Sequence, residues 1–401
     1  MQLDYLKTEK PAMPDFSNLA GAFAHKSNKE VRLAYQMFRL MNNPQLMKLG
    51  TTAAAWALKL GVPGVKNLIR NTVYKHFCGG ETVTEALEVV EKLDNYHIHT
   101  VLDYAAEAEE TAIGFDYVKE QILHNISLVK KNSGIGYISV KMTGLGHRSI
   151  FEKLARHQPL TDEEDASFIH THYRLDEICK RASEAGICVY IDAEESWLQE
   201  PIDEMAEKMM RLYNQQRVVV FTTLQMYRTD RLEYLRNLIK RNEQRHCILG
   251  IKLVRGAYWE KERQHTQWNQ KISPVFELKS ETDASFNEAV FMCLRHLPKV
   301  HLCLATHNTD SVELVVNQVI KNKLHHHRKL IHFSQLYGMS DNLTFALARA
   351  GYSTSKYLPY GEVEKAMPYL IRRAEENTAI AGQMSRELQL LKLEMVRRRI
   401  K

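Results

Sequence analysis

The chain has 401 residues, of which 44% are apolar, 25% charged and 9% aromatic, a composition typical of a folded globular protein rather than a disordered one. The formal charge of +6 is small for this length, and no long basic stripe interleaved with aromatic residues occurs, which argues against nucleic acid as a partner. The six cysteines lie far apart and form no Cys-x-x-Cys pair, so neither zinc spacing nor a disulfide framework is present.

The N-terminal part of the chain is predicted to be helical. Ser27 is placed to cap a run of apolar residues at helical spacing over 31–40. Further helices are predicted over 53–60 and 82–93, the last with Thr84 as its cap.

Targeting and membrane segments are not recognisable in the sequence. Acidic residues precede any apolar run at the N-terminus, unlike a signal or transit peptide. The most apolar stretch, 52–65, is too short to cross a bilayer and contains Lys59 and Pro63. We therefore expect a cytoplasmic protein without a membrane span.

The rest of the chain alternates short apolar runs with amphipathic helices. The runs lack strict alternation and are mostly rich in Val and Ile, which is typical of parallel strands buried on both faces. Eight βα units in series favour a closed (βα)8 barrel of the α/β class over an open sheet. The eight runs are Ile98 to Tyr104, Gly136 to Met142, Ile187 to Ala193, Val218 to Gln225, Ile248 to Val254, His301 to Thr306, Leu330 to Ser334 and Tyr352 to Tyr357.

An open doubly wound sheet is the alternative. That fold predicts a glycine-rich phosphate-binding turn after the first strand, but the residues after Leu102 are Asp-Tyr-Ala-Ala-Glu. We therefore expect that any bound nucleotide is held without a Rossmann fingerprint.

Polar residues lie at or just after the ends of seven of the eight apolar runs, where a barrel places its functional groups. A single polar residue at a strand end is weak support for a site, but polar residues at seven ends of one ring indicate a common mouth. They are Asp103, Lys141, Asp192 with Glu194, Gln225, Lys252 with Arg255, His307 with Asn308, and Tyr357.

Five motifs, in order on successive strands, resemble the proline dehydrogenases. The resemblance runs from about Phe77 to the C-terminus, and the Tyr-Leu-x-Arg-Arg motif is its most specific part. It resembles a monofunctional member, closer to the eukaryotic branch, and implies a distorted TIM-like barrel. The motifs are Ile138-Ser-Val-Lys141, Ile191-Asp-Ala-Glu-Glu195, Leu253-Val-Arg-Gly-Ala-Tyr258, Ala305-Thr-His-Asn308 and Tyr369-Leu-Ile-Arg-Arg-x-x-Glu-Asn377.

The resemblance implies oxidation of L-proline to 1-pyrroline-5-carboxylate with FAD as cofactor. Arg372 and Arg373 would bind the carboxylate, since guanidinium forks match it geometrically. Lys141 and Asp192 could pair across the barrel mouth. Tyr357 would leave little room for a 4-hydroxyl group, which favours proline over hydroxyproline. The implied substrate-side residues are Lys141, Asp192, Arg372, Arg373, Tyr357, Tyr369, Glu376 and Leu336.

The resemblance also implies a set of flavin contacts. Lys252 and Arg255 would meet pyrophosphate or ribityl oxygens, and Gly256 would let the backbone approach closely. A family position that often carries arginine is Lys252 here. The implied cofactor residues are Gln225, Lys252, Val254, Arg255, Gly256, Ala257, Tyr258, Trp259, Thr306, His307, Asn308 and Lys279. No metal site is predicted, because the run His325–His327 has no carboxylate nearby.

We predict three parts of the chain: a helical N-terminal segment over 1–95, the catalytic barrel with FAD over 96–380, and a C-terminal helix over 381–401. The family implies a membrane quinone as electron acceptor, which leaves two roles open for the basic segment 386–401. It either covers the barrel, which we favour, or makes a peripheral contact with the inner membrane.

Other functions remain open from the residues alone. A hydroxyproline dehydrogenase of the same family is one, and a barrel enzyme without flavin is another. A phosphorylated substrate would require a glycine-rich loop after strand seven or eight, where only Gly338 and Gly361 occur. A non-enzymatic interaction module would leave the ring of polar strand ends without a purpose.

Overall fold

The structure, a computed structural model, describes residues 13–43, 50–51, 53–54, 56–58, 60–105, 109–244, 246–268, 272–379 and 383–400, with the side chains of 374–379 and 383–385 left out. Eight strands follow one another in a closed barrel in the order β1 to β8, which confirms the predicted (βα)8 fold. The strands are β1 (His99–Tyr104), β2 (Ile135–Val140), β3 (Cys188–Ile191), β4 (Val220–Gln225), β5 (Leu249–Val254), β6 (Val300–Ala305), β7 (Ile331–Leu336) and β8 (Ser353–Tyr360).

The strands are buried because both of their faces are covered. Every residue of β4 is buried, including Thr222, Thr223 and Gln225, as expected of a strand covered on both faces. The prediction for the last strand was too short, because β8 continues beyond Tyr357 to Tyr360 and includes Pro359. Proline lacks a donor but still offers a carbonyl, which accepts a hydrogen bond from the backbone of Gly79 at 2.8 Å. β8 pairs in parallel with β1, and Tyr357 stands in register with Val101.

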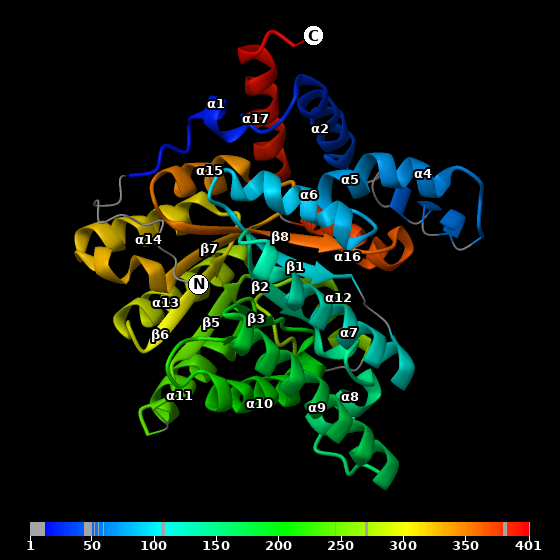
Figure 1. Ribbon diagram of the computed structural model, residues 1–401, viewed down its shortest axis with the longest axis vertical. Coiled ribbons are helices and arrows are strands. Elements are labelled where there is room, and N and C mark those ends of the chain that lie inside the picture. Colours follow the sequence, from blue (N-terminus) through cyan, green and yellow to red (C-terminus); the bar gives the residue numbers. More distant parts are fainter. Residues whose placement is uncertain are drawn as a thin grey trace. The chain divides into compact units, whose positions relative to one another are not determined.

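The chain divides into two compact units, and the first comprises the described residues of 107–306 and 310–333. In this unit, strands β2 to β6 alternate with helices that cover their outer side, drawn from cyan to yellow in Figure 1. The helical segments are α7 (Ala112–Leu128), η2 (Val129–Lys131), η3 (Met142–Gly144), α8 (Arg148–Ala155), α9 (Asp162–Ala185), α10 (Ser196–Tyr213), α11 (Arg231–Asn242), α12 (Trp259–Trp268), α13 (Lys279–Arg295), α14 (Thr309–Lys321) and η4 (Leu324–Leu330).

The second unit comprises the described residues of 8–106, 307–309 and 334–401. It holds β1, β8 and helices from both ends of the chain. They are α1 (Leu19–Ala22), α2 (Asn28–Met41), α4 (Val65–Ile69), η1 (Arg70–Tyr74), α5 (Lys75–Phe77), α6 (Val83–Asp94), α15 (Asp341–Arg349), α16 (Val363–Ala379) and α17 (Gln383–Arg397).

The N-terminal helices begin where their caps allow. Ser27 caps α2, as predicted, and its hydroxyl and the Glu30 side chain form a complete capping box. The cap of α6 is Thr82, whose hydroxyl accepts from the backbone of Glu85. The prediction of Thr84 was wrong because Thr84 already lies inside the helix.

Helix α17 packs against α2, and the two lie side by side in Figure 1. Leu391 is buried in a core shared with Phe38, and Leu388 and Met395 pack against the same core. Leu393 stays 56% exposed. Most of the apolar side chains of the segment 386–401 are therefore packed inside the second unit. Among the described residues, no helix combines the length and apolar character needed to cross a membrane.

Candidate active site

Asp192 lies just after β3 and is held by two buried donors. Its Oδ1 accepts from Lys252 Nζ at 2.6 Å, and its Oδ2 accepts from Ser139 Oγ at 2.7 Å. Burial raises the pKa of Asp192, but the charges of Lys252 and Lys141 and the two hydrogen bonds outweigh it, so the pKa is lowered overall. Asp192 is therefore a buried carboxylate that is stable in its ionised form.

The position of Lys252 on its strand explains why it binds Asp192. Lys252 lies within β5 rather than after it, which corrects the prediction that it follows the strand end. Its neighbour in register on β4 is Thr223, and Thr222 stands beside Ile191 on β3. Lys252 and Asp192 therefore belong to one row of the sheet, and the lysine reaches across β4. The ammonium also lies 4.9 Å from the ring of Tyr190.

Two residues further on, Glu194 occupies a drier environment. Its carboxylate accepts from the backbone of Thr143 at 3.0 Å and from the Thr143 hydroxyl at 2.5 Å. Burial is the largest influence and raises the pKa of Glu194 to about 7. Gln225 ties this segment to the next loop, because its amide donates to the Glu194 carbonyl at 2.7 Å and accepts from the Ala257 backbone at 2.9 Å.

Arg255, directly after β5, is fixed by three partners. Its Nε donates to Asp283 at 2.6 Å, one terminal nitrogen donates to the hydroxyl of Thr306 at 2.7 Å, and the other donates to Ser311 at 3.0 Å. The guanidinium also lies 4.5 Å from the ring of Phe286. A guanidinium held in this way loses little rotamer freedom when it binds an anion.

Lys279 contributes a second positive charge at this place. Its Nζ lies 2.5 Å from Asp283, on the carboxylate oxygen that Arg255 does not use. Burial raises the pKa of Asp283, and the hydrogen bonds from Lys279 and Arg255 lower it further than burial raises it. The weakly predicted Lys279 thus lies in the same charge cluster as Arg255.

The turn after β5 requires glycine. Gly256 has φ of +137°, and a Cβ built on it would lie 2.5 Å from the Tyr227 ring. The neighbouring residues are partly exposed: Val254 ends β5, Ala257 and Tyr258 lead into α12, and Trp259 begins it. The Trp259 indole donates to the carbonyl of Phe276 at 2.9 Å.

Replacing Gly256 by alanine should destabilise the protein by about 2–5 kcal/mol, since backbone strain and the ring clash add up. Gly361→Ala is the matched control: its φ of +136° is as strained, but the added Cβ would lie 3.5 Å from Tyr104. That variant should lose only about 1–3 kcal/mol. Chemical denaturation measures both, and equal losses would contradict the role of the Tyr227 contact.

The predicted substrate-side residues of the second unit lie on β7, β8 and α16. Leu336 ends β7 and is half-buried, and Tyr357 is buried within β8. On α16, Arg373 is buried and its guanidinium lies 5.2 Å from the ring of Tyr369. Arg372 is half-buried on the same helix. The side chain of Glu376 lies outside the described residues, so its predicted role stays a prediction.

His307 and Asn308 lie between β6 and α14, and both are partly exposed. His307 Nδ1 lies 2.9 Å from the hydroxyl of Ser340, which precedes α15. This contact joins a predicted cofactor residue to a part of the second unit for which the sequence predicted no function.

A family model described as proline dehydrogenase matches residues 86–386. The chain belongs to the proline dehydrogenase family.

Curated relatives agree with this membership. The carbapenem antibiotics biosynthesis protein CarD of Pectobacterium carotovorum is 32% identical over 328 residues, which cover 82% of this chain and 84% of CarD. Mitochondrial proline dehydrogenase 1 of Arabidopsis thaliana is 30% identical and covers 84% of this chain and 76% of its own length. The human mitochondrial proline dehydrogenase 1 is 33% identical over 59% of this chain and 40% of its own length.

Solved structures share the fold. Proline utilization A (PutA) from Bdellovibrio bacteriovorus matches with a TM-score of 0.76 at 19% identity, covering 94% of this chain and 44% of the PutA chain. This chain therefore spans less than half of that protein. Together with the family model, the match supports a barrel oxidoreductase of the proline dehydrogenase family.

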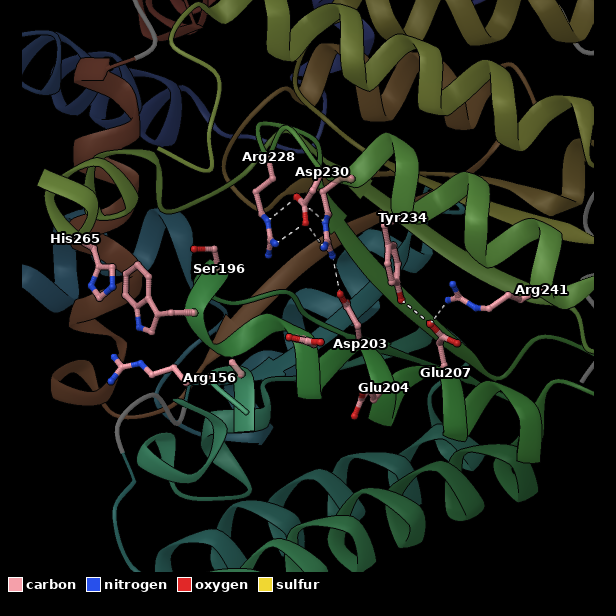
Figure 2. Close-up of a pocket in the computed structure, with 14 residues that line it drawn as sticks. Arg156, Ser196, Asp203, Glu204, Glu207, Arg228, Asp230, Tyr234, Arg241 and His265 are labelled. Atoms are coloured by element: carbon pink, nitrogen blue, oxygen red, sulfur yellow. Dashed lines mark hydrogen bonds and ion pairs between the residues drawn. The ribbon is translucent and has the colours of Figure 1, made fainter. Parts of the chain in front are cut away.

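A cavity of about 810 Å³ lies elsewhere in the first unit of this proline dehydrogenase family member, on the outer helices α10 and α11. Figure 2 shows Arg228 directed at Asp230 and Arg241 directed at Glu207. Arg231 binds Asp203 at 2.6 Å and Asp230 at 2.5 Å, and Arg228 binds Asp230 at 2.7 Å. None of the predicted site residues lines it. Because these charges already satisfy each other, we do not assign the substrate to this cavity.

Three residues of the site escaped the sequence analysis. Ser139 donates a hydrogen bond to Asp192. The sequence could have indicated this role, because Ser139 is a lone polar residue between the apolar residues Ile138 and Val140. Ser340 contacts His307, and Glu387 binds Ser340; nothing in the sequence around either residue indicates these contacts.

Proposed function

We propose that this chain is an FAD-dependent proline dehydrogenase that oxidises L-proline to 1-pyrroline-5-carboxylate. The observation that carries the proposal is the family match over residues 86–386, which includes every substrate-side and cofactor residue predicted above. The reaction removes a hydride from the carbon next to nitrogen and a proton from nitrogen, and leaves a C=N bond. FAD, when bound, supplies the hydride acceptor.

The residues after β5 and β6 fit a cofactor that carries a diphosphate. In the first unit, Lys252, Arg255 and Lys279 are cations, and the carboxylates Asp192 and Asp283 that face them have lowered pKa values. The cations therefore outnumber these carboxylates, which favours an anionic ligand. We propose that Arg255 and Lys279 bind the diphosphate, with Arg255 already held in position by its three partners.

A second observation concerns the segment that follows β6. Within the part of the chain that the structure describes, the buried hydroxyl of Thr309 has no hydrogen-bond partner. Thr309 begins α14, directly after the segment Thr306 to Asn308. A buried hydroxyl without a partner is costly, and helix N-termini favour anions. We propose that Thr306, His307, Asn308 and Thr309 contribute to the cofactor site.

For the substrate, we propose that Arg372 and Arg373 bind the carboxylate of proline. Tyr357, Tyr369 and Leu336 would supply the apolar surface against its ring. Lys141 and Asp192 would act electrostatically near the reacting atoms, and Glu376 would orient the arginines from its position later on α16.

The electron acceptor and the location of the protein are further proposals. The resemblance to the family supports a quinone-type acceptor, and we propose a cytoplasmic protein that contacts the inner membrane peripherally to reach it. Anaerobically reduced protein that a water-soluble quinone fails to reoxidise would contradict this acceptor.

The test of the proposal is the absorbance spectrum of purified protein before and after L-proline is added without oxygen. We expect a yellow protein whose flavin band is bleached by proline and at least about tenfold more slowly by 4-hydroxyproline, the discrimination typical of a pocket that must exclude one extra group. Protein that stays colourless after reconstitution with FAD would contradict the proposal.

The alternative substrate is decided at Tyr357. Tyr357→Ser opens space beside the ring and should narrow the preference for proline over hydroxyproline. Tyr360→Phe, on the same strand, is the matched control and should leave the preference unchanged. If hydroxyproline already reduces the wild-type protein faster, the hydroxyproline dehydrogenase alternative is favoured and the fold assignment stands.

A further inference from the structure

A chain of hydrogen bonds leads from His307 to the C-terminal helix. His307 Nδ1 lies 2.9 Å from Ser340 Oγ, and Ser340 Oγ lies 3.1 Å from Oε1 of Glu387 on α17. The same carboxylate oxygen also accepts from the backbone N–H of Ser340 at 2.8 Å. Ser340 is 2% exposed and Glu387 is 4% exposed, so the hydrogen bonds between these two residues are shielded from water.

The backbone of Ser340 is strained. Ser340 has φ of +51° and ψ of 42°, in the left-handed region that strains a residue other than glycine. Such conformations persist when the surroundings determine them, and they often occur at functional sites. Here the strain directs both the N–H and the hydroxyl of Ser340 to Glu387.

The residue after Ser340 is held just as firmly. The Asp341 carboxylate lies 2.6 Å from Lys26 Nζ, 2.8 Å from Lys356 Nζ and 3.3 Å from His25. Lys26 and His25 come from the N-terminal segment. The turn that carries Ser340 is therefore fixed on one side by α17 and on the other by the N-terminal segment, which gives both ends of the chain a role near His307.

The protons that Ser340 and Glu387 can donate determine which ring nitrogen of His307 is protonated. A serine hydroxyl has one proton, and a carboxylate only accepts. Burial and the charge of Asp341 raise the pKa of Glu387, but its Oε1 accepts from the Ser340 backbone and is an acceptor in the neutral acid as well. Ser340 therefore donates its proton to Glu387, and its oxygen accepts from His307. The imidazole must then carry a proton on Nδ1, and in its neutral form Nε2 is the acceptor.

We propose that Ser340 and Glu387 are positioning residues that hold His307 in its Nδ1–H form. This proposal rests on the proposed function only where it concerns the ligand. On the proposed function, a His307 ring fixed in this form contributes to the cofactor site in one defined orientation.

The first test needs no cofactor. In protein without FAD and labelled with ¹⁵N-histidine, long-range proton–nitrogen NMR identifies which ring nitrogen of His307 is protonated, with His307→Asn to assign the signals. We expect protonated Nδ1 in the wild type and in Glu387→Gln, whose amide oxygen keeps the acceptor. We expect exchange between the two ring forms in Ser340→Ala. A neutral ring protonated on Nε2 in the wild type would overturn the proposal.

The second test separates positioning from a general structural effect. Ser340→Ala should weaken FAD binding about 5- to 10-fold, the size of one lost hydrogen bond, as measured by flavin fluorescence. In a His307→Asn background, the same substitution should have no further effect. A loss that persists there would overturn the proposal, because Ser340 would then act without His307.

The control is Ser355→Ala, which removes another buried serine hydroxyl, 3.0 Å from Ser334. It should leave FAD binding unchanged. If the wild-type protein binds no FAD at all, the proposed function fails, whereas the NMR result still decides whether His307 is held in its Nδ1–H form.

Discussion

Replacing Arg373 by lysine should lower kcat/KM for L-proline about 30- to 150-fold, which corresponds to about 2–3 kcal/mol of lost binding in the transition state. Arg373 is buried on α16 against the ring of Tyr369. Lysine keeps the positive charge but loses the planar fork that binds both carboxylate oxygens, and it stacks less well on an aromatic ring. Steady-state kinetics with proline as the varied substrate measures the loss.

Two comparisons make this result specific. Arg372→Lys, at the half-buried neighbouring position, should cost less because water screens a more exposed charge. Arg397→Lys, on the exposed side of α17, should not change kcat/KM. The flavin spectrum of Arg373→Lys should match that of the wild type. Unchanged kinetics in Arg373→Lys would show that the carboxylate is bound elsewhere.

Replacing Lys252 by methionine should destabilise the protein by about 3–5 kcal/mol at neutral pH, because it leaves the buried charge of Asp192 without its closest partner. Methionine fills a similar volume, so the loss reports the charge rather than a cavity. Urea denaturation at pH 7 measures it.

The loss should depend on pH in a defined direction. In the wild type, the pKa of Asp192 is lowered from 3.8, so this carboxylate stabilises the fold above that value and loses its contribution as the pH falls through the lower folded pKa. Without Lys252, burial dominates and the folded pKa of Asp192 rises. The difference in stability between Lys252→Met and the wild type should therefore shrink as the medium becomes acidic.

The double variant Lys252→Met with Asp192→Asn provides the control. It removes both charges, and it should recover most of the stability that Lys252→Met loses. If the double variant is no more stable than the single one, the buried ion pair is not the cause. Both variants keep Ser139, so the neutral amide still has a hydrogen-bond partner.

The strands of the barrel could be predicted because strands that are buried on both faces require many apolar residues, which appear in the sequence as short apolar runs. All eight predicted runs correspond to strands. The boundary of β8 was wrong because Pro359 reads as a strand end, yet in the structure its carbonyl still accepts from Gly79. A proline in the sequence does not show by itself whether the strand tolerates the missing backbone N–H donor.

The partners within the site could not be predicted because they depend on register. Lys252 reaches Asp192 across one intervening strand, and no spacing along the chain encodes that distance. The prediction put Lys141 beside Asp192 from neighbouring strand ends, and the charge of Lys141 does lower the pKa of Asp192. The direct bond from Lys252 to Asp192 was not predicted. Similarly, Ser340 meets Glu387 over a separation of 47 residues.

The pairing of α17 with α2 has a consequence for biosynthesis. Arg398 donates to the carbonyls of Phe23 and Lys26, 375 and 372 residues earlier in the chain. During translation, α2 is synthesised long before α17, and contacts so distant in sequence form slowly. Until α17 is made, the core around α2 lacks this partner, and we expect the nascent chain to be more prone to aggregation in that interval.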